Sequence, residues 1–492
     1  MSIILDILKF IGVTLCVLLI FNFIILVHEW GHFLAARWRG LKIEKFQIGM
    51  GKPVWKRTWN GVQYGLGTIP IGGFVQLPQM APMGAIEGKA SGGELPPIKP
   101  LDKIIVALAG PLFSLGLAFL FACAVWKTGQ IRPDKPVVGY AVPGMPAYGS
   151  GQIKAGDEIL EIDGEKVTSF AALTRSVVWA IASGENQNVE FVIRREGESE
   201  PRKVVVNAPY KEGKEYKEWA DSTSWIQKLY KRPPLRKVGI APAAEARVEE
   251  VLPHSPGALA GLLKGDIVLT ANGEKIYNPG WISELASLKP TDPIAILVQR
   301  GATKMDLTLN PRVPEVDPRP AKDRTPMLGI GYESIHSEDP PLVYTSPFTL
   351  VADCFRNTAA TLKKLVTPSS PIGVSQMSGP VGILNVYYNI FQNPQWWRLV
   401  LWFSVVLNVG LAIFNMLPLP VLDGGHITMA VIEAIRRRPA NLKLMELLQV
   451  ACVMCLLSFV LFVTLKDVGQ IAQGDGSKIE FKPLPAPAAV TP

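Results

Sequence analysis

The chain has 492 residues, of which 48% are hydrophobic, with a mean hydropathy of +0.22 and a formal net charge of +8. This length and apolar content exclude an ordinary soluble enzyme and predict a protein that is integral to a membrane. The basic residues flank the apolar runs and belong to no recognisable nucleic-acid module, so no nucleic-acid partner is predicted.

Long apolar runs predict four transmembrane helices. The first run, Phe10 to Val27, contains no charged residue and is long enough to cross a bilayer. The predicted spans are residues 1–38, 104–127, 396–418 and 447–466. A signal peptide is the alternative for the first run, but no small-residue cleavage site follows it. The fold class is therefore a polytopic α-helical membrane protein.

The distribution of basic residues predicts the orientation of the spans. Ten Lys or Arg lie between Arg37 and Lys103, and Arg436-Arg437-Arg438 follow the third span. The positive-inside rule places both segments in the cytoplasm. The N-terminus, residues 127–398 and the C-terminal tail are then expected outside.

The first predicted span ends in the motif His28-Glu29-Trp30-Gly31-His32. Histidines four residues apart project from one face of a helix, so both can bind the same Zn²⁺. Glu29 points away by about 100° and can reach a water at the metal as a general base. The motif predicts a zinc site at the cytoplasmic margin of the membrane.

The segment between the first two spans, residues 39–103, contains a stretch rich in β-forming residues, Gly and Pro. We predict a β-hairpin at about residues 61–78, with an open edge that either enters protein-lined membrane space or accepts a substrate strand. Residues 80–103 are interpreted as a connector. In the second span, Pro111 is expected to kink the helix and to free a carbonyl.

An internal repeat follows the second span. Residues 154–167 recur as residues 263–276, an offset of 109 residues. Six positions are identical: Gly156/Gly265, Asp157/Asp266, Leu160/Leu269, Gly164/Gly273, Glu165/Glu274 and Lys166/Lys275. Each copy combines a Gly-Asp turn, a short strand, an Asp-Gly or Asn-Gly turn, a helical stretch and a further strand. So large a period indicates two tandem domains and not a solenoid.

Both copies resemble the PDZ domain, and the stretch from Pro253 to Leu262 is typical of bacterial PDZ sequences. We predict two tandem external PDZ-like α+β domains, at residues 130–210 and 236–312. The alternative is a β-rich spacer in which the Gly-Asp and Asn-Gly pairs only make turns. Residues 209–236 and 313–395 are interpreted as linkers, the latter with an amphipathic region on the outer membrane surface. The tail, residues 467–492, is predicted to be disordered.

Two histidines leave a zinc ion under-ligated, because catalytic sites use three protein ligands. The predicted third ligand is Asp423, in the cytoplasmic loop at residues 419–446, since helices one and three reach the same side of the membrane. Pro418 and Pro420 would break the helix there, and Gly424-Gly425 would permit the backbone angles that direct the carboxylate inward. His426 is a competing ligand. The alternative without a metal role is an Asp-Gly-Gly turn outside the membrane.

The remaining histidines and cysteines carry no predicted chemistry. His254 and His336 are expected to be ordinary surface or turn residues of the external region. Cys354 is the only cysteine outside the spans, so no disulfide framework is implied. Cys452 and Cys455 form a CxxC pair inside an apolar helix, where core packing is the better interpretation.

Taken together, these motifs resemble the site-2 protease family in its bacterial form. The resemblance covers nearly the whole chain and rests on the residues just described, together with Gly49-Met50-Gly51-Lys52, Ile71 to Val75, Ala109-Gly110-Pro111, Ser378-Gly379-Pro380 and Asn415 to His426. It implies an intramembrane zinc endopeptidase of the bacterial inner membrane. The implied partners are the lipid bilayer, single-pass membrane proteins such as anti-sigma factors and signal-peptide remnants, and peptides or C-termini in the PDZ grooves.

By the same resemblance, His28, His32 and Asp423 match the zinc ligands and Glu29 the base. Asn415 matches a residue that contacts substrate or stabilises the oxyanion. The stretch from Gly65 to Leu77, including Gly72, Gly73 and Phe74, matches a re-entrant β-loop that pairs with unwound substrate. The family commonly has Asn where this chain has Ser114, which leaves open the substrate contacts of the second span.

Two other classes of function remain as alternatives. The chain could be a non-catalytic membrane scaffold whose PDZ domains bind C-termini, although a scaffold needs no general base such as Glu29. It could also be a membrane-anchored peptidase for soluble peptides, which a site entered between helices would disfavour. Within the protease interpretation, we predict that the PDZ pair acts as a size filter and has no catalytic part.

Overall fold

The computed structural model describes residues 2–80, 98–131, 135–171, 176–184, 186–209, 214–222, 224, 233–317, 324–332, 342–367, 370, 372–373, 376–437 and 442–471. The chain forms two compact units. Unit 1 comprises Met1–Arg132, Pro341–Val366 and Met377–Gly469, and unit 2 comprises Pro133–Pro340, Thr367–Gln376 and Gln470–Pro492. The predicted connector at 81–97, His336 and the tail beyond residue 471 lie outside the described residues.

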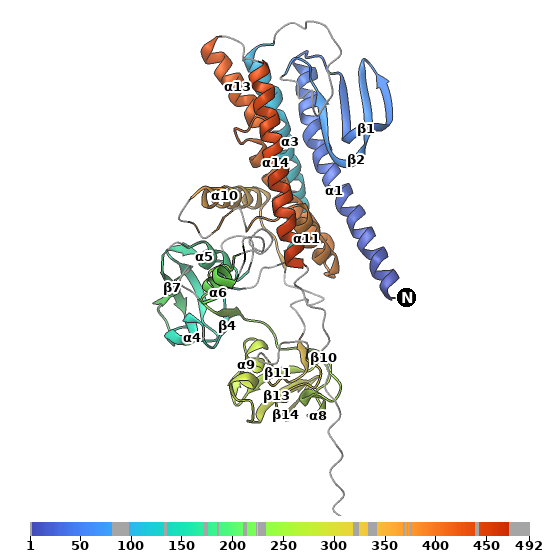
Figure 1. The fold of residues 1–492 in the computed structure, drawn as a ribbon. Coiled ribbons are helices and arrows are strands. Elements are labelled where there is room, and N and C mark those ends of the chain that lie inside the picture. The colour runs from blue at the N-terminus through green and yellow to red at the C-terminus, as the bar shows by residue number, and fades with distance from the viewer. Residues whose placement is uncertain are drawn as a thin grey trace, which may run out of the picture. The chain divides into compact units, whose positions relative to one another are not determined.

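Within the described residues, unit 1 contains four helices that are long and apolar enough to cross a membrane. They are α1 (Ser2–Trp38), α3 (Pro100–Thr128), α12 (Trp396–Asn415) and α14 (Leu442–Ile471) (Figure 1). Each contains one of the predicted apolar runs, so the prediction of a polytopic helical membrane protein is confirmed. α3 begins four residues before the predicted boundary and continues through Pro111, which is buried.

Small residues let these helices approach closely. A Cβ at Gly31 of α1 would lie 2.5 Å from the carbonyl oxygen of Ala109 in α3. Further along α3, Ala118 and Ala122 pack against Val405 and Val409 of α12. Such contacts suit membrane helices, whose association depends on close van der Waals packing.

The predicted amphipathic region contains two helices that pack on the spans. α10 (Pro347–Val366) buries Leu350 and Cys354 against α3 and α12. α11 (Pro380–Gln392) buries Tyr387 completely, in a cluster with Val13 and Val17 of α1. The Asp467 carboxylate of α14 accepts hydrogen bonds from the main-chain amides of Gly379 and Gly382, at 2.8 and 2.7 Å, and so anchors the start of α11. This contact gives the Ser378-Gly379-Pro380 stretch a structural role.

A β-hairpin lies beside α1 in Figure 1, but its strands are not those predicted. β1 (Lys45–Trp59) and β2 (Val62–Gln76) meet at a turn in which Asn60 and Gly61 have φ of 46° and 79°. Residues 62–76 are thus one strand whose partner lies upstream, and the prediction of a hairpin confined to residues 61–78 was wrong. The Asn60-Gly61 pair is a strong signal for a hairpin turn, and it marks the point where the two strands meet.

The strands of the hairpin bend back on themselves. Residues 45–48 pair with residues 73–76 on one side and with residues 63–66 on the other, while residues 55–59 pair with 62–66. Within the described residues, the segment 73–76 therefore has a strand neighbour on one side only. This open edge belongs to the segment that contains Gly73 and Phe74.

Unit 2 folds the two copies of the repeat into sheets of the same strand order. The first sheet has the order β6-β5-β7-β8 and the second β12-β11-β13-β14, with all neighbours antiparallel. The strands of the first are β5 (Glu158–Ile162), β6 (Glu165–Lys166), β7 (Asn188–Arg194) and β8 (Arg202–Asn207). Those of the second are β11 (Ile267–Ala271), β12 (Glu274–Lys275), β13 (Ile294–Arg300) and β14 (Thr303–Leu309).

Shorter elements complete each copy in the same way. In the first copy, β4 (Val138–Ala141) pairs with β9 (Ile240–Pro242), and α4 (Pro146–Ser150) and α5 (Val177–Ser183) flank the sheet. In the second, β10 (Val248–Val251) pairs with β15 (Ile330–Tyr332), accompanied by α8 (Pro256–Leu259) and α9 (Gly280–Leu288). The helix α6 (Lys214–Ser222) lies in the stretch interpreted as a linker. Each copy has its own apolar core.

The identical Gly-Asp turns serve the same purpose in both copies. Asp157 accepts two hydrogen bonds from Arg195, at 2.7 and 2.8 Å, and Asp266 accepts two from Arg300, both at 2.7 Å. Each aspartate also caps its own turn, through the amides of Lys154 and Leu263 respectively. The turn is therefore held to the strand that follows the helix.

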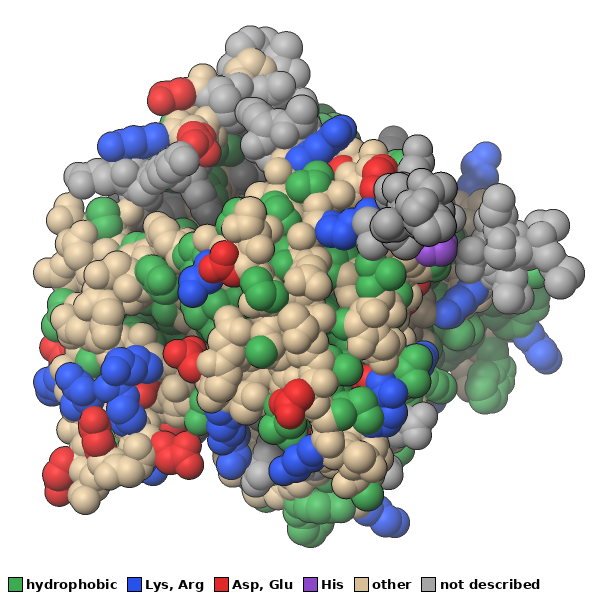
Figure 2. All heavy atoms as spheres, turned by 90° about the horizontal axis from the view of Figure 1, so that it is seen from below, with side chains coloured by type: hydrophobic (Ala, Val, Ile, Leu, Met, Phe, Trp, Pro, Cys, Tyr) green, Lys and Arg blue, Asp and Glu red, His purple; other side chains and the backbone are tan. Residues whose placement is uncertain are grey.

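The charged residues show no gathering of one sign on the face drawn in Figure 2. Lys and Arg lie there among Asp and Glu, and the described residues on this face form no continuous basic patch.

Candidate metal centre

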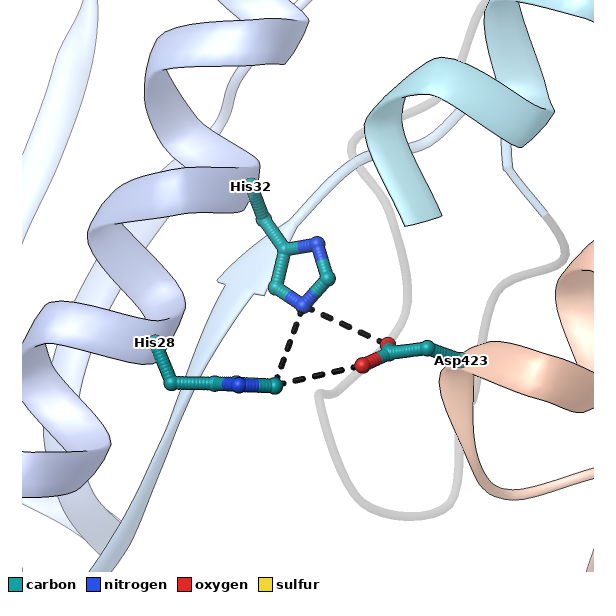
Figure 3. Close-up of side chains that lie close together, drawn as sticks. All are labelled: His28, His32 and Asp423. Carbon is teal, nitrogen blue, oxygen red and sulfur yellow. Dashed lines mark hydrogen bonds and ion pairs between the residues drawn. The ribbon is translucent and has the colours of Figure 1, made fainter. Parts of the chain in front are cut away.

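Three side chains from distant parts of the chain converge in unit 1. His28 and His32 project from α1, and Asp423 projects from the first residue of α13 (Asp423–Arg436) (Figure 3). The Nε2 atoms of His28 and His32 lie 3.2 and 3.3 Å from the two carboxylate oxygens of Asp423 and 3.3 Å from each other. One ligand atom from each residue falls within a group no wider than 4.8 Å.

Asp423 reaches this point because a tight turn separates α12 from α13. The turn holds Pro418 and Pro420, and α13 begins directly at Asp423 where a loop had been predicted. Gly424 and Gly425 are buried against the main chain of Met416, Leu417 and Leu419, and a Cβ at either position would overlap those atoms. Neither glycine has a positive φ. The predicted reason for the glycines, special backbone angles, was therefore wrong, because close approach of the turn requires them.

Gly110 of α3 makes room for the histidine rings. A Cβ at this position would overlap His32 Nε2 and would lie 2.9 Å from Cε1 of His28. The Ala109-Gly110-Pro111 stretch thus borders the site directly, although it carries no reactive group itself.

The other ring nitrogen of each histidine has its own partner. His32 Nδ1 lies 2.8 Å from the carbonyl oxygen of Val106, and His28 Nδ1 lies 3.0 Å from the hydroxyl of Ser114. A carbonyl can only accept, so His32 carries its proton on Nδ1 and presents a lone pair at Nε2. Contacts of this kind orient ligating histidines in metal proteins.

The nitrogen and oxygen atoms that face one another are suitable ligands for a bound cation. When both rings carry their proton on Nδ1, the two Nε2 atoms and the ionised Asp423 carboxylate present only lone pairs to one another. Among the described residues, Asp423 Oδ2 has no hydrogen-bond donor. Two imidazoles and one carboxylate are also a ligand set found in catalytic zinc sites.

Two further predicted residues border this group. Asn415, the last residue of α12, has its Nδ2 atom 3.2 Å from His28 Nε2. Glu29 follows His28 in α1, and a Cβ added to Gly73 would lie 3.6 Å from Glu29 Cγ and 3.4 Å from Cγ2 of Ile25. Gly73, which belongs to the segment with the open edge, therefore lies next to Glu29.

The other predicted residues are placed as follows. Gly72 has φ of 83° and faces Met50, and Phe74 pairs with Gln47 within the hairpin. His426 lies in the first turn of α13, and the three-residue group found among the described residues does not include it. His254 lies in unit 2 with φ of 59°, in the turn before α8, as expected of a turn residue.

One contact near the site was missed by the sequence analysis. Asn22 of α1 donates a hydrogen bond of 2.8 Å to the carbonyl of Pro70 in β2. The contact ties the hairpin to α1 two helical turns before Glu29. The sequence indicated this contact only through a single amide side chain in a run of apolar residues. Polar groups inside membrane spans usually have a partner or a function.

Two histidines and a carboxylate beside a glutamate, at the end of a membrane helix, form the arrangement of a membrane-embedded metallohydrolase. The model of peptidase family M50 matches residues 16–459. The chain therefore belongs to peptidase family M50, the site-2 protease family.

Several curated proteins resemble the chain over most of its length. It is 27% identical over 454 residues to the regulator of sigma-E protease RseP of Escherichia coli (strain K12). The matched region covers 85% of this chain and 90% of that protein. It is 26% identical over 453 residues to the RseP of Salmonella typhimurium (strain 14028s / SGSC 2262), with the same coverage. For the regulator of sigma E protease of Haemophilus influenzae, the identity is 26% over 467 residues, covering 90% and 95%.

Membership of this family establishes the activity. The chain is a zinc metalloendopeptidase with a site-2 protease function, and its cofactor is zinc. It acts in a membrane on membrane substrates, and its four apolar helices fit an inner-membrane protein. The alternative of a non-catalytic scaffold is not favoured.

Proposed function

We propose that His28, His32 and Asp423 hold the zinc ion and that Glu29 is the general base of peptide hydrolysis. The observation that carries this proposal is the convergence of the two Nε2 atoms and the two Asp423 carboxylate oxygens, with contacts of 3.2–3.3 Å. Asp423 is the third ligand in preference to His426, because its carboxylate faces both imidazoles.

When bound there, zinc supplies Lewis-acid polarisation of the scissile carbonyl and lowers the pKa of the attacking water. Glu29 takes the proton of that water and returns it to the leaving amine. Asn415 directs its amide toward the same point, where it can donate to the oxygen that becomes negative. These residues are thus proposed to carry out the reaction of the family in this chain.

The substrate is proposed to be a transmembrane segment that unwinds before cleavage. A helical segment offers no scissile carbonyl, because its backbone groups are already paired. The open edge at residues 73–76 can pair with the unwound segment by strand addition, next to Glu29. Gly72, Gly73 and Phe74 are then contacts to substrate.

The hairpin that carries this edge is proposed to be membrane-associated. Its outer part exposes Val54, Trp55 and Trp59, with Lys56 and Arg57 among them. Exposed tryptophans beside basic residues suit the interface between lipid and water. These exposed residues support the proposed contact of the hairpin with the bilayer.

The two copies of the repeat in unit 2 are proposed to be PDZ-like domains outside the cytoplasm, together with the N-terminus. The common strand order of the two sheets and the excess of basic residues between α1 and α3 support this arrangement. Their grooves would take extended peptides or C-termini. The proposed substrates are single-pass membrane proteins, such as anti-sigma factors and signal-peptide remnants, of the inner membrane.

Substitution of the proposed base tests the function. A short single-pass substrate is co-expressed with the wild-type protein or with Glu29→Gln, and fragment size and zinc content are measured. The variant is expected to retain zinc and to lose cleavage by a factor of roughly 10²–10⁴, the usual contribution of a general base. Unimpaired cleavage by Glu29→Gln would contradict the proposal.

The zinc ligands are tested by comparing Asp423→Ala with His426→Ala. Asp423→Ala is expected to lose most of its bound zinc, whereas His426→Ala should retain it. Loss of zinc in the His426 variant alone would exclude Asp423 as the third ligand.

A further inference from the structure

We propose that Ser114 is a positioning residue, which holds the His28 ring and its proton in the state that can bind the metal. This inference rests on the proposed function, in which His28 is a zinc ligand. Ser114 lies in α3 with no exposed surface and its hydroxyl is 3.0 Å from His28 Nδ1. The sequence had identified Ser114 only as a departure from a common pattern.

The metal can bind Nε2 of His28 only when the proton of the neutral ring is on Nδ1. That tautomer requires an acceptor at Nδ1. For His32 the acceptor is the main-chain carbonyl of Val106, at 2.8 Å. For His28 the corresponding position is occupied by a side chain, so this ligand depends on the identity of residue 114.

The contacts of His28 are compatible with Ser114 as the acceptor. A hydroxyl carries lone pairs as well as a proton, so Ser114 can accept the proton of His28 Nδ1 across their 3.0 Å contact. On the other side of the ring, the Asn415 amide lies 3.2 Å from Nε2 and is a donor, which requires a lone pair there. Both contacts are satisfied when the proton of the His28 ring is on Nδ1.

The main chain of Gly110 is the competing partner of His28. It lies against the same ring, since a Cβ on Gly110 would be 2.9 Å from His28 Cε1. If Gly110 alone oriented the ring, removal of the Ser114 hydroxyl would change little. The two possibilities therefore predict different metal affinities for a variant that lacks only the hydroxyl.

The experiment compares zinc affinity in the full-length protein in detergent, by competition with a chelator. Ser114→Ala is expected to bind zinc roughly 10–100-fold more weakly than wild type, as is usual when the partner of a ligating histidine is removed. Ser404→Ala is the matched control, because Ser404 is also buried and its hydroxyl donates to Val400 within α12. It should bind zinc as the wild type does.

A spectroscopic measurement separates positioning from general packing. With Co²⁺ in place of zinc, the visible absorption bands report the geometry of the ligands. They are expected to shift in Ser114→Ala and to remain unchanged in Ser404→Ala. Ser114→Thr and Ser114→Val have the same shape but differ in the hydroxyl, so the threonine variant should bind Co²⁺ more tightly than the valine variant.

Two results would overturn the inference: wild-type zinc affinity in Ser114→Ala, or equal losses in Ser114→Ala and Ser404→Ala. His28→Ala, measured in parallel, tests the proposed function separately. If His28→Ala retains zinc at wild-type affinity, the ligand assignment fails. If it loses zinc while Ser114→Ala does not, only the role of Ser114 fails.

Discussion

At the scale of single residues, the ring of His32 leaves no room for a side chain at position 110. The motif of His28, Glu29 and His32 was recognisable in the sequence, because its spacing lies within one helix. The residues that support them were harder to predict. Gly110 and Ser114 lie on α3, far from α1 in the sequence, and only helix packing brings them to the rings.

Gly110→Ala is expected to displace the His32 ring. The forced movement should cost about 1–3 kcal/mol of stability, as overpacking usually does, and zinc affinity should fall by more than about tenfold. Gly116→Ala in the same helix is the control, since a Cβ there meets nothing within 4 Å. Zinc content after dialysis against a chelator measures the effect. Equal zinc retention in the two variants would contradict the close approach at Gly110.

At the scale of elements, the Gly-Asp turn of each repeat copy is tied to a strand by an arginine. The sequence repeat revealed the turn but not its partner, because Arg195 and Arg300 stand at offsets of 38 and 34 residues from their aspartates. The hairpin shows the same limit. Its Asn60-Gly61 turn was local information, whereas the pairing of residues 45–48 with two other segments is not.

Arg300→Ala is expected to destabilise the second repeat, because it leaves the carboxylate of Asp266 without its cation. The Asp266 side chain is only 1% exposed. Arg194→Ala removes an exposed ion pair with Glu158 and should cost less than about 1 kcal/mol. Urea unfolding of the full-length protein provides the comparison, followed by proteolysis within residues 236–312 for Arg300→Ala and within residues 130–210 for Arg194→Ala. Losses of the same size would argue against the turn contact.

The same contact predicts a dependence on pH. The hydrogen bonds from Arg300 lower the pKa of the Asp266 carboxyl below its ordinary value. The stabilisation is therefore complete above the unfolded pKa of about 4 and is lost as the pH falls through the lower folded pKa. Arg300→Ala should make the stability of this repeat less dependent on pH in the acid range, which unfolding at a series of pH values would show.

At the scale of the whole molecule, unit 1 is assembled from three separate parts of the chain. The parts before and after unit 2 are held together by a short strand pair. β3 (Gln130–Ile131) pairs with β16 (Leu342–Val343), and Arg398 donates a hydrogen bond to the carbonyl of Gly129. The two chain ends that lead into unit 2 are thus neighbours within unit 1.

This pairing permits a clean test of the size-filter prediction. Replacing residues 133–340 by a short glycine linker should leave unit 1 folded and zinc bound, because residues 131 and 342 are already paired. The variant is expected to cleave short membrane substrates at close to the wild-type rate and to accept substrates with large external domains as well. Fragment analysis with a short and a long substrate measures both. Complete loss of cleavage of the short substrate, with zinc retained, would count against the filter.

The sequence by itself determined the features that depend on local composition and spacing. These are the apolar spans, the His28-Glu29-His32 motif, the prediction of Asp423 as the partner of that motif, and the repeat in unit 2. The tertiary structure decided which residues from other helices complete the site. Ser114, Gly110 and Asn22 act through contacts between segments far apart in the chain, and glycines 424 and 425 serve close packing. Sequence periodicity describes one helix or strand at a time. It cannot show which side chains fit where two of these elements pack together.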